Sequence, residues 1–280
     1  MNKKALRKKS RRKELNKKSG ERSIKLWDEF EAEGKLKYAI FLPVIVALAA
    51  GIYFVYSSYN TNGFFGFPLD DPWIHLTFAK NIVDYGSFSY FKNEIVTSGS
   101  TSPVYTLLLS LLYLFIKNEF IISYILGITF GALLVYMIIK LSGTHFKNGG
   151  MLALLTGLLV ALQPKLNLIN VSGMETSMFI FFIAASFYAY QTGKMIMLGI
   201  FLGLTIWCRP DGFVLWIAIA LDYFLIKYFS KNISADVIQH KNILKAFSIA
   251  ITFAAGYFIF NYLLSGSILP NTYSAKLEFY

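Results

Sequence analysis

The sequence predicts an all-α integral membrane protein with about seven transmembrane helices and a long outer loop that carries interfacial helices. The 280 residues are 55% hydrophobic and only 15% charged, whereas a soluble domain is about 25% charged. Apolar runs of roughly transmembrane length recur along the chain, and polar loops separate them. The basic residues gather at one end, as the sidedness of a membrane protein requires.

The first 37 residues predict a basic cytoplasmic tail. Residues 1 to 38 hold fourteen Lys and Arg against six Asp and Glu, while the rest of the chain holds thirteen against ten. Clustered Lys and Arg are also typical of nucleic-acid binding. A basic segment ahead of a first span is the expectation of the positive-inside rule, and such a segment can rest on anionic lipid. We therefore expect membrane lipids, and no nucleic acid, as its partners.

The remaining residues, 38–280, predict one membrane domain. The first apolar run, 38–59, is too long for the core of a signal peptide, so we expect it to remain as a span. The single cysteine excludes an internal disulfide framework and a cysteine-based metal cluster. Seven more apolar runs follow, at about 103–116, 119–140, 150–163, 176–193, 195–208, 212–226 and 246–264.

The sidedness of the loops indicates how many of these runs cross. If all eight cross and the N-terminus is inside, the outer loops receive Lys140, Lys147, Lys194, Lys227, Lys231, Lys241 and Lys245, against the positive-inside rule. The run 103–116 reaches only about 21 Å, against a hydrocarbon core of roughly 30 Å. If it is interfacial or re-entrant, seven spans remain and these lysines become cytoplasmic. The outer loop then covers about residues 60–119.

Four polar motifs then collect on the outer side of the membrane. Charged residues beside spans are costly and tend to mark a site or a water-filled cavity. The motifs are "LDDPW" with Asp70 and Asp71, "VSGMETS" with Glu175, "CRPDG" with Arg209 and Asp211, and "GSILPNTYSAK" with Asn271 and Lys276.

The first motif predicts the start of a surface helix over residues 72–84. Asp71 before Pro72 is typical of an N-cap followed by proline at the first helical position. At 100° per residue, Thr77, Lys80, Asn81 and Asp84 form a polar face opposite an apolar one. Such a helix should lie along the membrane surface, with both carboxylates at its partly positive N-terminus.

These side chains have the chemistry of a transfer reaction. An ionised carboxylate at the water boundary can act as general base towards a hydroxyl group. Arg209, Lys276 and His75 could bind the phosphate of a leaving group and stabilise the charge that grows on it.

Each residue also has an alternative interpretation. Asp70, Asp71 and Glu175 could bind a divalent cation through their oxygen atoms, although neighbouring side chains rarely point the same way. Glu175 could instead cap the helix that follows it. Arg209 could anchor a short span at the interface, and His75, on the apolar side of its helix, could be a packed histidine. We expect no cofactor other than this cation, if one binds.

The motifs "LDDPW", "SGSTSPVYTLLLS", "SGMETSMFIFF", "LGLTIWCRPDG" and "GSILPNTYSAK" occur in this order between residues 38 and 276. In this order they resemble the GT-C membrane glycosyltransferases. The nearest likeness is to the branch that includes the mycobacterial arabinofuranosyltransferases; the protein O-mannosyltransferases and the lipid A aminoarabinose transferase are more distant.

The resemblance implies transfer of a sugar from a polyprenyl-phosphate donor to a glycan, lipid or protein acceptor on the outer face of the cell membrane, with inversion. Asp70 would be the catalytic base and Asp71 its helper. The substrate-binding residues would be His75, Lys80, Glu175, Arg209, Asp211, Asn271 and Lys276. Two features differ from the family: Thr77 replaces an Arg of the surface helix, and relatives continue with more spans and often an outer domain. The chain could therefore be a fragment, one part of a split gene or a minimal form, and a C-terminal partner domain could supply acceptor recognition.

Two other classes of function compete with this one. The chain could be a transporter or flippase-like carrier of an anionic or lipid-linked substrate, or a non-catalytic membrane subunit. A transporter favours charges near the bilayer midplane and internal pseudo-symmetry. Here the charges lie at the outer ends of the predicted spans and the sequence has no internal repeat, which favours the enzyme.

Overall fold

The computed structural model describes residues 39–92, 99–145, 150–229, 242–268 and 270. The predicted basic tail, 1–37, and the site candidates Asn271 and Lys276 lie outside this part of the chain. Within it, the regular structure is helical and contains no strand, which agrees with the predicted all-α class.

The helices begin and end close to the apolar runs of the sequence. They are α3 (Phe41–Asn62), α4 (Pro72–Tyr85), α5 (Pro103–Tyr113), α6 (Glu119–His145), α7 (Gly150–Ala161), α8 (Pro164–Asn170), α9 (Thr176–Gln191), α10 (Met195–Cys208), the short 3₁₀ helix η1 (Pro210–Gly212), α11 (Phe213–Phe229) and α12 (Ile243–Ser265).

Four of the described helical segments are long and apolar enough to cross a membrane: α3, most of α6, η1 with α11, and α12. A fifth is α7 with α8 if this pair, bent by 62°, is one span. By length, α5 and α10 are shorter apolar helices of 11 and 14 residues. Length and composition therefore support four to five of the seven predicted spans.

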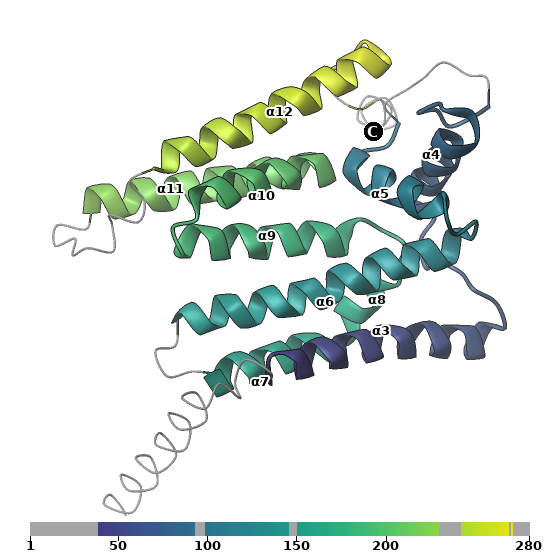
Figure 1. Cartoon of the computed structure of the whole chain (residues 1–280), viewed down its shortest axis with the longest axis horizontal. Helices are drawn as coiled ribbons and strands as arrows, with labels where there is room; N and C mark the ends of the chain where they lie inside the picture. Colours follow the sequence, from purple (N-terminus) through teal and green to yellow (C-terminus); the bar gives the residue numbers. More distant parts are fainter. Residues whose placement is uncertain (1–38, 93–98, 146–149, 230–241, 269, 271–280) are drawn as a thin grey trace, which may run out of the picture.

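The bundle consists of α3, α6, α7, α9, α10, α11 and α12, which lie side by side (Figure 1). Helices α4, α5 and α8 gather towards one end of it. We call this the α4 end; it holds the last residues of α3, α10 and α12 and the first residues of α6 and α9. Every described polar motif of the predicted outer side therefore belongs to one end of the bundle.

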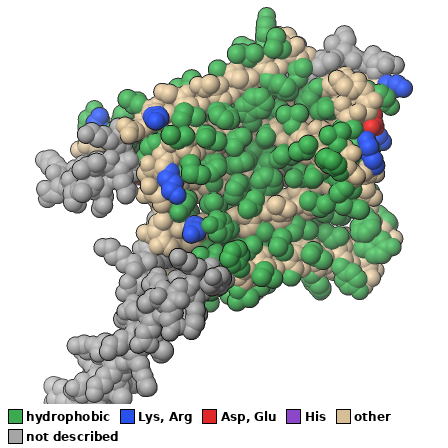
Figure 2. Space-filling model, viewed as in Figure 1, with side chains coloured by type: hydrophobic (Ala, Val, Ile, Leu, Met, Phe, Trp, Pro, Cys, Tyr) green, Lys and Arg blue, Asp and Glu red, His purple; other side chains and the backbone are tan. Residues whose placement is uncertain are grey.

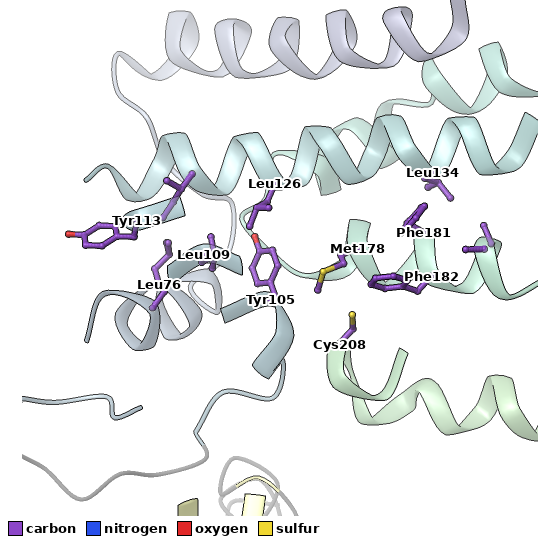
Figure 3. Packing of buried hydrophobic residues seen from close by; sticks show 14 residues of the cluster. Leu76, Tyr105, Leu109, Tyr113, Leu126, Leu134, Met178, Phe181, Phe182 and Cys208 are labelled. Carbon is purple, nitrogen blue, oxygen red and sulfur yellow. The ribbon is translucent and has the colours of Figure 1, made fainter. Parts of the chain in front are cut away.

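Apolar side chains cover the visible flank of the bundle, while Lys and Arg lie towards its two ends (Figure 2). This distribution is typical of a protein whose flank faces lipid and whose ends face water. Beneath the α4 end, buried side chains from α4, α5, α6 and α9 form one apolar cluster, which includes Leu76, Tyr105, Leu109 and Met178 (Figure 3). This cluster joins α4 and α5 to the bundle.

The bend between α7 and α8 directs the chain towards the candidate site. It falls at Gln163 and Pro164, where the Gln163 side chain accepts a hydrogen bond from Leu166 N at 2.9 Å. Asn170, at the end of α8, packs against Gly127 and Gly131 of α6, and its Oδ1 accepts a hydrogen bond from Ser177 Oγ at 2.8 Å. These contacts hold both ends of the 171–175 loop.

Candidate functional site at the α4 end

The Asp70–Asp71 pair lies in the turn that starts α4. Their carbonyl oxygens accept hydrogen bonds from Trp73 N at 3.1 Å and Ile74 N at 3.0 Å, and Pro72 occupies the first helical position. Both residues are exposed. Asp71 is the N-cap residue by position, but its side chain makes no capping hydrogen bond. Its carboxylate is therefore not used by the helix that it precedes.

The 171–175 loop packs directly beneath this turn. Gly173 has a φ of +78°, and a Cβ atom there would lie 2.7 Å from Phe67 Cε1 and 3.0 Å from Pro72 Cβ. Tyr105 of α5 donates a hydrogen bond from its hydroxyl to Gly173 O at 2.9 Å. Only glycine meets both the backbone conformation and the space, so "SGME" and "LDDPW", a hundred residues apart, pack against each other.

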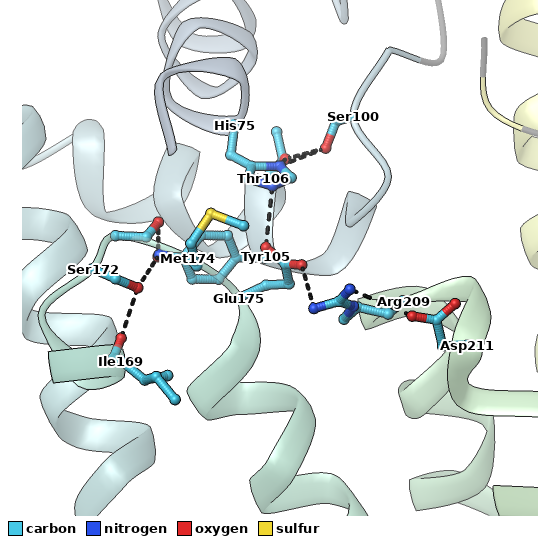
Figure 4. A network of polar contacts seen from close by, with 11 residues as sticks. His75, Ser100, Tyr105, Thr106, Ile169, Ser172, Met174, Glu175, Arg209 and Asp211 are labelled. Carbon is cyan, nitrogen blue, oxygen red and sulfur yellow. Dashed lines mark hydrogen bonds and ion pairs between the residues drawn. The ribbon is translucent and has the colours of Figure 1, made fainter. Parts of the chain in front are cut away.

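A buried polar cluster adjoins the contact between these two segments (Figure 4). His75 Nε2 is 3.2 Å from Glu175 Oε2, and the two side chains are each only 4% exposed. This is an ion-pair distance, but the contact lacks the alignment of a good hydrogen bond. On the other side of the ring, Ser100 Oγ lies 2.9 Å from His75 Nδ1 and 2.8 Å from Thr106 Oγ1. The cluster therefore joins α4, the start of α5 and the start of α9.

Arg209 connects this cluster to the solvent. Its NH1 lies 3.7 Å from Glu175 Oε1 and its NH2 lies 3.4 Å from Asp211 Oδ2, and its side chain is 37% exposed. The backbone leaves α10 in an extended conformation at Arg209 before Pro210 starts η1. The guanidinium also lies 5.8 Å from the ring centre of Phe179. A half-exposed cation thus ends a row of buried polar groups.

Glu175 is placed for these partners rather than for capping. It is the N-cap residue of α9, and its carbonyl accepts a hydrogen bond from Phe179 N at 3.0 Å. Its side chain makes no capping hydrogen bond. The capping alternative is therefore correct for the position of Glu175 but not for its carboxylate, which contacts His75 and Arg209.

The electrostatics of the cluster favour an ionised Glu175. Burial alone would raise the pKa of this carboxyl group, but the contact with His75 and the charges of His75 and Arg209 outweigh it, so the pKa is lowered. Burial, with a smaller contribution from the Glu175 charge, raises the pKa of the Tyr105 hydroxyl. Tyr105 is therefore a neutral hydrogen-bond donor at physiological pH.

Lys80, a predicted substrate ligand, lies away from this cluster. Its Nζ is 3.7 Å from Glu119 Oε1, because residues 75 and 80 are about 140° apart around a helix. Asn81 differs from its predicted place on the polar face, since it is buried and its Nδ2 donates to Ser89 O at 2.8 Å and Tyr90 O at 2.9 Å. Because two carbonyl groups accept hydrogen bonds from this amide nitrogen, burial of Asn81 does not leave Nδ2 without a partner.

The structure thus brings together His75, Glu175, Arg209 and Asp211 by direct contacts, with the turn of Asp70 and Asp71 packed on the same loop. No contact joins either aspartate side chain to that cluster within the described segments. Among the same residues, no group of three or more His, Cys, Asp or Glu side chains is arranged to hold a metal ion.

Three residues of the cluster had no predicted role: Ser100, Tyr105 and Thr106. Their signal in the sequence is "SGSTSPVYT", a group of hydroxyl-bearing residues directly before an apolar helix. Ser100 and Thr106 are fully buried and Tyr105 is almost so. Hydroxyl groups that precede a helix are commonly read as caps and turns, so only the fold indicates that these contact a histidine.

Compared with protein-family models, the chain matches none, and compared with curated proteins it gives no significant match. The resemblance described above therefore rests on its motifs.

Proposed function

We propose that this chain is a membrane glycosyltransferase that transfers a sugar from a polyprenyl-phosphate donor to an acceptor on the extracytoplasmic face. The observation that carries the proposal is the pairing, on one end of an apolar bundle, of two exposed carboxylates with a half-exposed guanidinium. The loop that packs against Phe67 and Pro72, on either side of Asp70 and Asp71 in the sequence, is the same loop that contacts Arg209 through Glu175.

In this reaction, Asp70 accepts the proton of an acceptor hydroxyl group while the oxygen attacks the anomeric carbon of the donor. The bond between that carbon and the phosphate oxygen breaks, and polyprenyl phosphate leaves with the electron pair. Arg209, which has N–H groups beyond those that face Glu175 and Asp211, stabilises the charge on the departing phosphate. One displacement inverts the anomeric centre and needs no covalent intermediate.

The proposal includes a membrane orientation. Helices α3, α6, α7 with α8, α9, α10, α11 and α12 would be the seven spans, the N-terminus would be cytoplasmic, and the α4 end would face outwards. The side-by-side arrangement of α3, α6, α7, α9, α10, α11 and α12 supports this count (Figure 1), and α8 bends away from α7 by 62°. The short α5, at one end of the bundle, fits an interfacial helix.

The deciding experiment compares the wild type with Asp70→Asn in lipid nanodiscs, with labelled polyprenyl-phosphate sugars and a panel of glycan, lipid and protein acceptors. Loss of a general base should lower kcat by about 100- to 10,000-fold. Asp84→Asn is the matched control, because Asp84 lies on α4, the helix that follows Asp70, and pairs with Lys117 at 3.2 Å. We expect this control to transfer sugar at nearly the wild-type rate.

Two results would contradict the proposal. Equal rates for the wild type and Asp70→Asn would remove Asp70 as the base. If no donor of this class transfers its sugar to any acceptor, the proposed glycosyltransferase function is wrong.

A further inference from the structure

His75 is buried in a part of α4 that the proposed reaction does not use. The His75 side chain is 4% exposed, and so is the Glu175 side chain beside it. Neither group can touch a substrate that approaches from solvent, so their effect on the reaction must pass through other residues. The neighbours that can transmit it are Arg209, which contacts Glu175, and the Asp70–Asp71 turn, one helical turn before His75.

The contacts around the imidazole define where its proton lies. A carboxylate accepts hydrogen bonds and donates none, so the nitrogen that faces Glu175 must carry a hydrogen. The other nitrogen, Nδ1, faces Ser100 Oγ, which in turn faces Thr106 Oγ1. Hydroxyl groups can donate along this row, from Thr106 to Ser100 and from Ser100 to Nδ1. The row can also run in the opposite direction if Nδ1 carries a hydrogen, so the position that these contacts fix is the hydrogen on Nε2.

We infer that His75 is the positioning residue of this site: its imidazole, held at Nδ1 by Ser100 and Thr106, directs Nε2–H at Glu175 and so fixes the carboxylate that holds Arg209. Because His75 belongs to α4, the same contact ties the helix that begins at Asp71 to the loop before α9. The distance between Asp70, the candidate base, and Arg209, the candidate ligand of the phosphate, then depends on the buried pair of His75 and Glu175. For its link to catalysis, the inference rests on the proposed function.

The proton arrangement can be tested without any assay of activity. The full chain, labelled with nitrogen-15 in its histidines, is reconstituted in nanodiscs, and the His75 signals are assigned by their loss in His75→Gln. We expect a hydrogen on Nε2 in the wild type. Glu175→Leu removes the acceptor of that hydrogen, so Nε2 should lose it and Nδ1 should carry one instead, where Ser100 Oγ can accept it.

Ser100→Ala and Ser186→Ala form a matched pair of controls. Ser100 and Ser186 are both fully buried, but Ser186 Oγ donates within its own helix, to Phe182 O at 2.8 Å. Only Ser100→Ala should shift the Nδ1 signal. A wild-type imidazole protonated on Nδ1 alone, or His75 signals that do not change in Glu175→Leu, would overturn the inference.

Kinetic measurements distinguish a positioning role of His75 from a purely structural one. If Arg209 stabilises the charge on the departing phosphate, His75→Gln and Arg209→Gln should each lower kcat about tenfold or more, with a smaller rise in the KM for the donor. The double variant should be little worse than either single one, because coupled residues are not additive. Additive losses would contradict the positioning role. If the wild type transfers no sugar, the proposed function fails, and the proton arrangement is still decided by the spectra.

Discussion

Glu175 is a charged side chain held almost entirely out of solvent, and such a group is stable only when its charge is compensated. His75 and Arg209 lower the pKa of its carboxyl group, and Tyr105 lies close enough for the Glu175 charge to raise the pKa of its hydroxyl. A carboxyl group whose pKa is lower in the folded state stabilises that state at higher pH.

We therefore expect a pH-dependent stability difference between the wild type and Glu175→Gln. The stabilisation is fully present above the unfolded-state pKa of about 4.3 and is lost as the pH falls through the lower folded-state value. At neutral pH the variant should lose about 1 to 3 kcal/mol of unfolding free energy, as for a buried polar group deprived of its partner. Thermal unfolding in nanodiscs between pH 3 and pH 8 measures this, and equal melting temperatures at neutral pH would contradict it.

At the level of elements, the site depends on how α8 and the 171–175 loop dock on α6. A Cβ atom at Gly127 would overlap the backbone carbonyl of Asn170, and one at Gly131 would overlap its side chain. These two glycines lie four residues apart, on one face of α6. They form the groove that receives the end of α8, and the loop with Glu175 begins directly after it.

Gly127→Ala should therefore disturb the site from a distance. Overpacking a close contact costs about 1 to 3 kcal/mol, and here the contact is with backbone. Gly143→Ala is the control on the same helix, where a Cβ atom meets nothing within 4 Å; it should be neutral or stabilising by up to about 1 kcal/mol. Melting temperatures in nanodiscs compare the two. If Gly127→Ala is as stable as Gly143→Ala, the docking of α8 does not depend on this close approach.

For the whole molecule, the decisive property is the sharing of one bundle end by motifs far apart in the chain. The α4 turn, the 171–175 loop and the end of α10 meet there, while Lys194 lies between α9 and α10 at the opposite end. In the proposed orientation these two ends face opposite sides of the membrane.

Thiol labelling of intact cells tests that orientation. Cys208 is the one cysteine of the sequence and is fully buried, so background labelling by an impermeant reagent should be low. Cysteine substitutions at the exposed positions Asp84 and Lys194 report on the two ends. Asp84→Cys should react from outside, whereas Lys194→Cys should react only after lysis. The reverse pattern would place the α4 end in the cytoplasm.

The positions of the helices could be predicted from the sequence because apolar length and helix signals are local properties. The runs at 38–59, 119–140 and 246–264 correspond to α3, α6 and α12, and Pro72 starts α4 as its position after Asp71 predicts. The number of spans is a weaker inference. It depends on charge counts in the loops, and by length and composition the described helices include four to five spans.

The sequence by itself determined an apolar helical protein with polar motifs at the helix ends, because composition and periodicity need no knowledge of neighbours. Only the tertiary structure decided which of those polar residues meet. His75, on the apolar face of α4, faces a carboxylate a hundred residues away, and Ser100 and Thr106 complete its contacts, whereas Lys80 on the same helix turns to Glu119. Such contacts depend on the packing of α4, α5 and α9 against each other, and no local pattern specifies that packing.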